Sequence, residues 1–535
     1  MKDHYDYIIV GGGSAGAVVA ARLSENPRAQ VCLLEAGGPG NSFVTRIPMA
    51  ALLQLPYQLN NWAFRTVPQT QLNGRKLFQP RGKVLGGSSQ LNAMLYVRGQ
   101  REDYEEWQAQ GCAGWGWEDV LPYFRASENN ENGATTYHGA EGPLSVANQA
   151  RLRPVSEAFI AAAETVQISR TEDFNTGSNA GVAPYQVTQF FDDERRGLRA
   201  STKAVYLDPI RDRPNLTVLT GTLAEKICFN GNRATGVTIH QRGRSRTLSA
   251  GSEVILCAGA FQSPHLLMLS GIGPAGHLKE NGVAVVHDLP GVGQNLQDHL
   301  DVTLGYQSDH PEMLGLTLGN MRFALQEIAR WRRTGTGLLT SPAAEIGAFY
   351  SSAPDIPRPD IQLHFVIGIV DQHAQKIHRS SGYSCHACLL RPKSRGKIQL
   401  ASSNPRTAPH IDPKYLSDPD DLTRMINGAK RMHQIMHADP LAPFRKKELW
   451  LPPNPSDSDW EAYIRARAET IYHPVGTCKM GVDADAVVDP SLKVRGVTGL
   501  RVVDASVMPT IPSGNTNAPT IMIAERAADF IRSGQ

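Results

Sequence analysis

The sequence predicts an α/β fold with more than one domain. The chain has 535 residues, whereas single hydrophobic cores rarely grow beyond about 250–300 residues. Apolar residues make up 41% and charged residues 20% of the chain, which is typical of a folded globular protein. Near the N-terminus, residues 5–35 have the pattern of a strand, a glycine turn, a helix and a second strand, the unit from which doubly wound parallel sheets are built.

The spacing of these N-terminal elements also predicts a ligand. Residues 5–10 (YDYIIV) are rich in β-forming side chains, residues 11–16 (GGGSAG) interrupt the strand, and a helix rich in Ala and Val runs to about residue 23. A second apolar strand at 31–34 ends at Glu35, about 20 residues after the last glycine. This spacing is typical of a dinucleotide-binding site.

Each part of the motif has a physical task. Gly11 permits the tight turn, Gly13 lets the backbone approach a pyrophosphate, and Gly16 lets the helix pack closely on the sheet. The helix N-terminus offers unpaired N–H groups to phosphate, and Glu35 can accept hydrogen bonds from the adenosine ribose. The residues expected at the dinucleotide are Gly11, Gly13, Ser14, Ala15, Gly16, Glu35 and Ala36. A chance glycine turn is the alternative, and the motif alone does not separate NAD from FAD.

Charge and composition exclude other classes of protein. Lys and Arg number 54 against 51 for Asp and Glu, which gives a net charge of +3. This is too near neutral for a protein that binds nucleic acid or another polyanion. Gly and Pro are frequent (49 and 35) but not periodic, which favours a loop-rich fold over a fibrous or low-complexity one.

The N-terminus does not have the pattern of a signal peptide. Asp6 interrupts the first apolar residues before the glycine cluster, and no basic segment leads into an apolar core. No run of about 18 apolar residues occurs, so no transmembrane helix is expected. We expect a cytoplasmic protein. Peripheral attachment to the inner membrane stays open, as does the oligomeric state.

The seven cysteines are scattered along the chain, which argues against a disulfide framework. Cys385 and Cys388 form a CxxC motif inside the strand-like run YSCHACLL. Side chains three residues apart on a strand point to opposite faces, so two packed strand cysteines are favoured over a redox or metal-binding pair. No metal site is expected.

The C-terminal part of the chain indicates a flavin. Residues 499–505 (GLRVVDA) have the pattern of a short strand that ends at Asp504. A carboxylate there can accept hydrogen bonds from the ribityl hydroxyls of a flavin. Taken alone, the pattern also fits any strand that is followed by a solvated Asp.

Four further motifs, in order along the chain, carry a family resemblance. GKVLGGSSQLN (82–92) resembles the first signature of the glucose–methanol–choline (GMC) flavin oxidoreductases, and GAFQSP followed by SGIG (259–273) resembles the second. HPVGTCKMG (473–481) and NTNAPT (515–520) also match. The resemblance covers nearly the whole chain. Within the family it looks most like bacterial acceptor-linked alcohol dehydrogenases and their relatives that oxidise polyethylene glycol or choline.

The resemblance implies an α/β architecture of two parts, the GMC fold. Residues 1–150, 195–300 and 465–535 would form a discontinuous, Rossmann-like FAD-binding domain. Residues 151–194 and 301–464 would form an α+β substrate-binding domain built on an antiparallel sheet.

Three shorter segments carry expectations of their own. Residues 41–79 would cover the flavin. Residues 361–365 alternate between apolar and polar side chains, which predicts a strand buried on one face. The polar, glycine-bearing stretch 371–382 is a candidate mobile loop at the mouth of the pocket.

The resemblance also assigns cofactor contacts. The loop with Gly86 and Ser88 would pass the pyrophosphate and the flavin, and Asn92 to Met94 would lie near the reactive N5 edge. The full set that it adds is Gly86, Ser88, Asn92, Ala93, Met94, Ala224, Asp504, Ala505, Asn517, Pro519 and Thr520. Some members of the family carry a histidine that is bonded covalently to the flavin. Leu91 stands at that position here, so FAD is expected to be bound non-covalently.

Two residues are expected to carry the chemistry. Oxidising an alcohol removes a proton from oxygen and a hydride from carbon; FAD accepts the hydride at N5. A histidine suits the proton because its pKa lies near working pH. His473 matches the active-site histidine of the family, and Asn515 matches its partner position. We expect His473 to take the proton and Asn515 to orient the hydroxyl.

The activity that follows is oxidation of primary, aliphatic alcohols to aldehydes, with electrons passed to a quinone or another non-oxygen acceptor. Three alternatives stay open: an oxidase that reduces O2, a choline or sugar-alcohol dehydrogenase, and a hydroxynitrile lyase that keeps FAD without redox chemistry. Glu345 is a candidate substrate residue, because a related glutamate holds the trimethylammonium group in choline-oxidising relatives. A packed or solvated strand carboxylate explains Glu345 equally well.

Overall fold

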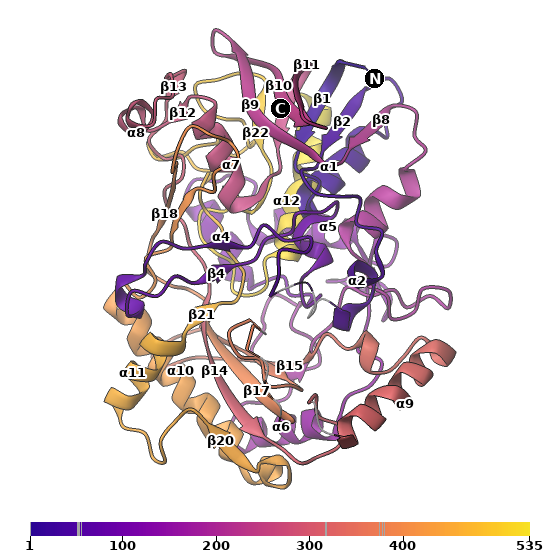
Figure 1. Ribbon diagram of the computed structural model, residues 1–535, viewed down its shortest axis with the longest axis vertical. Helices are drawn as coiled ribbons and strands as arrows, with labels where there is room; N and C mark the ends of the chain where they lie inside the picture. The colour runs from indigo at the N-terminus through magenta and orange to yellow at the C-terminus, as the bar shows by residue number, and fades with distance from the viewer. Residues whose placement is uncertain are drawn as a thin grey trace.

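Two seven-stranded sheets organise the structure, a computed structural model that describes residues 2–50, 54, 56–315, 318–373, 375, 376, 378 and 380–535 (Figure 1). In Figure 1 one sheet lies in the upper half of the molecule, where both chain ends are marked, and the other lies in the lower half. The predicted α/β fold with two sheet-based parts is confirmed. Within the described residues, no helix combines the length and the apolar character that crossing a bilayer requires.

The first sheet is mainly parallel and contains the N-terminal motif. Its strands are β1 (His4–Val10), β2 (Val31–Leu34), β8 (Leu216–Leu219), β9 (Thr222–Asn230), β10 (Arg233–Gln241), β11 (Arg244–Leu256) and β22 (Leu500–Val502). Their order is β8-β2-β1-β11-β10-β9, and β22 pairs with β11. The strands from β8 to β11 and the added β22 are parallel, whereas β10 is antiparallel to both of its neighbours.

The N-terminal elements lie where the sequence predicts them. β1 and β2 agree with the predicted strands to within one residue, and helix α1 (Ser14–Leu23) ends where expected. Every residue of β2 is buried, as in a parallel sheet that is covered on both faces. Helix α12 (Asn517–Ser533) packs on both α1 and α5 (Trp117–Ser127), so the end of the chain covers its beginning (Figure 1).

Gly16 sets the distance between α1 and the sheet. A Cβ atom at this position would lie 1.9 Å from the carbonyl oxygen of Gly11 and 3.2 Å from the Cβ of Cys257. Gly11 itself has a φ of +105°, in the left-handed region that favours glycine. The helix therefore starts directly beside the ends of β1 and β11, where its N-terminus can reach a ligand.

The second sheet is antiparallel throughout. Its strands are β7 (Gly181–Pro184), β14 (Leu300–Gln307), β15 (Ala344–Tyr350), β16 (Ile361–Val366), β17 (Gly382–Leu389), β20 (Lys447–Leu449) and β21 (Glu469–Thr470). Their order is β20-β14-β17-β16-β15-β7, and β21 pairs with β14. Helices α6 (Pro154–Thr165) and α10 (Pro419–His437) pack on one face of this sheet, and α11 (Asp457–Arg467) packs on α10.

Strand β16 differs from its prediction in one respect. The alternation is present, but all six residues are buried, because the strand lies in the middle of the sheet and both faces are covered. Leu363 and Phe365 belong to the core beneath the helices. Gln362 and His364 are buried on the opposite face, so the prediction of one exposed face is wrong.

The CxxC motif lies on β17, as predicted. Cys385 packs in the core beneath the helices, whereas Cys388 packs in a second cluster on the other side of the strand. Both are free, buried thiols, and burial raises the pKa of each well above its ordinary value. The interpretation as two packed strand cysteines is confirmed.

The remaining helices and strands are short or peripheral. They are α2 (Phe43–Arg46), α4 (Arg101–Ala109), α7 (Gly259–Leu269), α8 (Ala275–Glu280), α9 (Leu318–Thr334), β3 (Phe64–Arg65), β4 (Phe78–Gln79), β5 (Glu128–Asn130), β6 (Leu144–Val146), β12 (Ile272–Gly273), β13 (His287–Asp288), β18 (Lys397–Gln399) and β19 (His410–Asp412). The strands of the first sheet fall in the ranges predicted for the FAD-binding domain. Those of the second fall in the substrate-binding ranges, except β21 and the first residue of β14. The domain boundaries themselves stay a prediction.

Candidate active site

One cavity is shared by the two sheets. It has a volume of about 380 Å³, and its walls come from strand ends and glycine turns of the first sheet and from β16 and β17 of the second. His473 and Asn515 both line it. So do most of the predicted cofactor residues, namely Gly11, Gly13, Ser14, Ala15, Glu35, Ala36, Ser88, Asn92, Ala93, Met94, Ala224, Asp504, Ala505, Asn517 and Thr520.

The other three predicted cofactor residues are not part of the cavity wall. Gly16 packs α1 on the strand ends. Gly86 has a φ of +94° and turns the chain so that its neighbour Gly87 reaches the cavity. Pro519 is buried in the first turn of α12, next to Thr520, which lines the cavity. These residues shape the wall without forming its surface.

Two glycine turns meet at the end of the cavity near α1. A Cβ atom on Gly87 would lie 2.6 Å from the Cα of Gly13, so the turns are in contact backbone to backbone. Helix α1 begins at Ser14 without a side-chain cap, and the first N–H groups of a helix have no partner within the helix. The partial positive charge of such an end attracts phosphate.

Glu35 is held by backbone N–H groups of the N-terminal glycine turn and of its own loop. Its Oε2 accepts a hydrogen bond of 3.0 Å from the Gly12 N–H, and its Oε1 accepts one of 2.7 Å from the Gly37 N–H. Burial raises the pKa of this carboxyl to about 7, although the two backbone bonds act in the opposite direction. Free lone pairs on both oxygens remain available to hydroxyl donors.

Asp504 joins the end of β22 to the start of α7. Its Oδ2 accepts hydrogen bonds from the Gly259 N–H at 2.8 Å and from the Ser263 hydroxyl at 2.5 Å. Its Oδ1 accepts a bond of 2.8 Å from the Ser506 N–H. Burial raises its pKa above the ordinary range. The carboxylate therefore holds the cavity wall together, besides being exposed to the cavity.

A chain of hydrogen bonds determines which nitrogen of His473 carries a proton. The Leu390 carbonyl can only accept, so His299 donates its Nε2–H to it over 2.9 Å. The Nδ1 of His299 therefore has a free lone pair, which accepts the Nδ1–H of His473 over 2.9 Å. His473 is left with an unprotonated Nε2, which lies 3.1 Å from the Nδ2 of Asn515.

Asn515 is oriented from its other side. Its Oδ1 accepts a hydrogen bond of 3.1 Å from the Nε2 of Gln362 on β16, so its Nδ2 faces His473. Gln362 is held in turn by the Tyr185 hydroxyl at 2.9 Å. An oxygen atom placed beside this pair would meet a donor on Asn515 and an acceptor on His473. Those are the two contacts that a hydroxyl group can make at once.

Burial sets the charge of the histidines around this point. It is the main cause that lowers the pKa of His473 well below the ordinary 6.5, and His299 and His364 lower it further. Burial also lowers the pKa of His299 to about 4 and that of His364 to about 3. All three imidazoles are therefore neutral at pH 7, and the Nε2 of His473 can accept a proton.

Three histidines of the cavity wall, His265, His364 and His386, were not singled out from the sequence. His364, on β16, has both ring nitrogens buried without a hydrogen-bond partner among the described residues. His386, on β17, is bonded through Nδ1 to Asp301 at 2.6 Å and to Thr303 at 2.9 Å. In the sequence, His364 occupies a polar position of the alternating run 361–365. That polar face was interpreted as facing solvent, so His364 was not considered for the site.

The wall around these histidines is largely apolar and locally strained. Its apolar members include Met49, Leu95, Pro342, Ala344, Val366, Val370 and Ile471. Met94, Ala343 and Tyr472 also line the cavity, with φ values of +64°, +66° and +75°. Left-handed backbone is uncommon outside glycine, and such strain tends to gather at functional sites.

Two predicted segments border the cavity in part. From residues 41–79, Pro48, Met49 and Trp62 line it. From residues 371–382, His373 and its neighbours line an adjoining cavity of about 50 Å³, which shares Tyr472 and His386 with the first. Residues 374, 377 and 379 lie outside the described residues, so the mobility of this loop stays a prediction.

Glu345 does not line the cavity. It lies on β15 with 1% of its side chain exposed and forms an ion pair with Arg153. Its oxygens also accept hydrogen bonds from the Ser156 hydroxyl at 2.7 Å and the Ser341 hydroxyl at 3.2 Å. The sequence left open whether Glu345 is a substrate residue or a packed or solvated carboxylate. In the structure it is a packed carboxylate. Arg153 and the two hydroxyls occupy the carboxylate, and a substrate contact of Glu345 stays a prediction.

Comparison with known proteins shows a likeness over almost the whole chain. Residues 5–301 and 392–524 match two family models, both described as GMC oxidoreductase. The chain is 47% identical over 534 residues to the alcohol dehydrogenase (acceptor) of Pseudomonas putida, covering 98% of this chain and 95% of that one. It is 43% identical over 546 residues to the mitochondrial choline dehydrogenase of Homo sapiens, covering 99% and 90%.

A solved structure has a similar fold. It is a formate oxidase of Aspergillus oryzae RIB40 that was described for the effect of a mutation on FAD modification. It superposes with a TM-score of 0.91 at 26% identity and covers 100% of this chain and 99% of its own. The overall fold of this chain is thus similar to that of a solved oxidase structure whose FAD is modified.

Proposed function

The chain belongs to the GMC oxidoreductase family, and we propose that it is an FAD-dependent dehydrogenase that oxidises primary, uncharged alcohols to aldehydes. The observation that carries this proposal is the unprotonated Nε2 of His473 beside the Nδ2 of Asn515 on the cavity wall. A base and a hydrogen-bond donor at one position serve the removal of a hydroxyl proton.

The far end of the cavity fits FAD. Backbone N–H groups are available to a pyrophosphate at the uncapped start of α1 and in the two glycine turns that meet at Gly13 and Gly87. The Nε2 of His265 lines the cavity and is buried without a partner among the described residues, as is the ring of His364 at the reactive end. Buried polar atoms are normally satisfied, so a polar ligand that reaches both ends would complete the site. When bound, FAD supplies the acceptor for the hydride.

His473 and Asn515 divide the work on the hydroxyl group. Asn515 donates an N–H to the alcohol oxygen and holds it, while the Nε2 of His473 takes the hydroxyl proton. His299 keeps the ring of His473 in the required tautomer. The backbone N–H of His473 donates to Asp298 at 2.8 Å, which fixes the loop that carries the ring. Imidazole geometry is therefore set before any substrate enters.

The charge of the wall favours an uncharged substrate. Glu35 and Asp504 are the carboxylates on the described wall of the cavity, and both belong to the dinucleotide end. Glu345 is paired with Arg153, and Asp301 lies behind His386 in a hydrogen bond. A cation at the reactive end would thus be desolvated without a free carboxylate to pair with.

Choline is the second candidate substrate, because one of the relatives is a choline dehydrogenase. Trp62, Phe261 and Tyr472 line the cavity, and aromatic faces can hold a quaternary ammonium group. We place choline second because aromatic faces without a carboxylate supply less stabilisation for a cation than a cage that contains one.

The electron acceptor that we propose is a quinone or another non-oxygen acceptor. The support is the Pseudomonas putida relative, an alcohol dehydrogenase of the acceptor type. We propose that the protein is cytoplasmic and that peripheral attachment to the inner membrane gives it access to a quinone. An oxidase that reduces O2 is the alternative for this half of the reaction.

The function is tested by mixing the oxidised protein with a panel of alcohols in the absence of oxygen. We expect butanol and benzyl alcohol to bleach the flavin absorbance faster than choline does, because the reactive end has no free carboxylate. A quinone analogue should then restore the absorbance at once, whereas air should restore it slowly.

Three results would contradict parts of this proposal. Absence of bleaching with every alcohol would favour a non-redox lyase. Faster bleaching by choline would overturn the uncharged substrate. Peroxide formed at the rate of alcohol loss would replace the dehydrogenase with an oxidase.

FAD should be released intact when the protein is denatured. Leu91 has a hydrocarbon side chain that cannot bond covalently to the flavin, and it lines the cavity. After precipitation by heat or acid, the flavin absorbance of the supernatant is measured and compared with that of the redissolved pellet. Flavin that stays on the precipitated chain would show a covalent link at another residue.

A further inference from the structure

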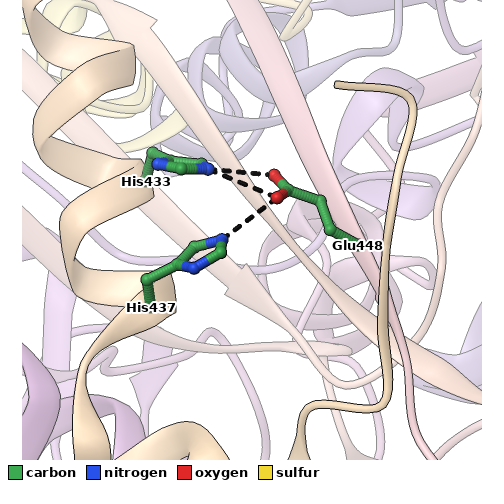
Figure 2. A group of neighbouring side chains, drawn as sticks. All are labelled: His433, His437 and Glu448. Atoms are coloured by element: carbon green, nitrogen blue, oxygen red, sulfur yellow. Dashed lines mark hydrogen bonds and ion pairs between the residues drawn. The ribbon is translucent and has the colours of Figure 1, made fainter. Parts of the chain in front are cut away.

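Two histidines and a glutamate form a cluster on the helix-covered side of the second sheet. His433 and His437 stand one turn apart at the end of α10, and Glu448 lies on the edge strand β20. Figure 2 shows both imidazole rings directed at the same carboxylate from neighbouring turns of the helix. None of the three lines the cavity described above.

The distances between the ligand atoms suit a metal ion. The Nε2 of His433 lies 3.2 Å and 3.3 Å from the two oxygens of Glu448, and the Nε2 of His437 lies 3.0 Å from its Oε2. One nitrogen or oxygen from each residue falls within 4.8 Å of the others. In a tetrahedral zinc site with bonds of about 2.0–2.1 Å, neighbouring ligand atoms are about 3.3 Å apart. The two histidine–carboxylate distances are therefore close to this spacing, and all three ligand atoms lie within 4.8 Å of one another.

The surroundings support a cation at this point. Glu448 is held by the Tyr306 hydroxyl at 3.0 Å, the kind of outer contact that orients a ligating carboxylate. α10 ends at His437, and the partial negative charge at a helix C-terminus favours positive charge. Arg445, one of the nearby cations, is held by the Met436 carbonyl at 2.7 Å, and Lys446 is paired with Asp309. The site is also reachable, because 40% of the His437 side chain is exposed.

We propose that His433, His437 and Glu448 bind one divalent zinc-type metal ion, with water at the fourth position. Two imidazoles at i and i+4 on a helix with one carboxylate are a known donor set for Zn²⁺. Such an ion would tie the edge strand β20 to α10 and thereby stabilise the margin of the second sheet. This site departs from the expectation of no metal. Its third ligand, Glu448, lies eleven residues after His437 and on a separate element.

The test uses the untagged holoenzyme after removal of metal with a chelator and dialysis. Calorimetric titration with Zn²⁺ should show saturable binding of one equivalent per chain, and the melting temperature should rise when Zn²⁺ is added. X-ray absorption at the zinc edge should report two imidazoles and lighter oxygen or nitrogen ligands. Because these readouts do not depend on alcohol oxidation, their failure is distinct from failure of the proposed function.

Variants identify the ligands. His437→Gln and Glu448→Gln keep the size of each side chain well enough for folding and should each weaken binding by more than about 100-fold, beyond the 10–100-fold seen for outer contacts. His410→Gln, at an exposed histidine of β19, is the matched control and should bind Zn²⁺ as the parent does. Absence of saturable binding to the parent protein would overturn the proposal. So would unchanged binding by the double variant His433→Gln/His437→Gln.

Discussion

His473→Ala should slow the alcohol-dependent bleaching of the flavin by about 10²–10⁴-fold, the range for a general base, while FAD stays bound. The Nε2 of His473 is the unprotonated atom next to Asn515, and the alanine variant has no acceptor for the hydroxyl proton. FAD should be retained because the glycine turns and Glu35 are distant parts of the wall. The measurement is rapid mixing without oxygen, with the flavin content of each variant determined first.

Two further variants separate the base from the residues that position it. Asn515→Ala should slow the reaction less, because it removes a donor to the oxygen and leaves the base. His299→Leu removes the acceptor for the Nδ1–H of His473, so it should lower kcat by up to about 10²-fold through misplacement and leave KM nearly unchanged. An unchanged rate in His473→Ala would move the base to another residue, with His364 as the first candidate.

The pH dependence provides an independent check on the same histidine. Burial lowers the pKa of His473 well below 6.5, and the neutral ring is the active form. The rate of flavin bleaching should therefore be level from about pH 8 down through pH 6.5 and should fall only at lower pH. An acidic limb centred at or above pH 6.5 would mean that the ring is solvated in the working enzyme.

The parts that sequence predicts well are those whose contacts are local. The strand, glycine turn, helix and second strand of residues 5–35 are specified by neighbours in the chain, and their bounds agree with the structure to within one residue. Gly11 and Gly16 could be assigned their roles because the motif alone indicates that a side chain at either position would clash with the backbone. The likeness of the later motifs to one family then placed His473 and Asn515 near the same point, and the structure brings them to 3.1 Å.

The parts that sequence missed depend on pairing between distant elements. His299 and His473 are 174 residues apart, and Gln362 meets Asn515 only because β16 lies in the middle of the second sheet. An alternating strand does not reveal whether its polar face meets solvent or an enclosed cavity. The position of Glu448 also depends on distant pairing. The antiparallel pairing of β20 with β14 brings it next to Tyr306 and to α10.

Glu345→Ala should destabilise the protein by about 3–5 kcal/mol, the usual result of removing one partner of a buried ion pair. The side chain of Arg153 is only 6% exposed, so the variant would leave its positive charge buried without a counter-charge. Ser156 and Ser341 would also lose their acceptor. Urea denaturation followed by fluorescence measures the loss. Glu118→Ala, which breaks an exposed pair with Arg101, is the control and should cost about 1 kcal/mol or less.

The same variant also decides between the two interpretations of Glu345. If the carboxylate only holds Arg153, then the folded part of the population should keep the parental KM for alcohols and for choline. Replacing both partners by apolar residues, as in Arg153→Met/Glu345→Leu, should recover much of the lost stability, because a packed apolar pair avoids the desolvation of two charges. A variant of parental stability with a raised KM for choline alone would instead place Glu345 against the substrate. That outcome would require Arg153 to leave its partner when choline binds, at the cost of an unpaired buried charge.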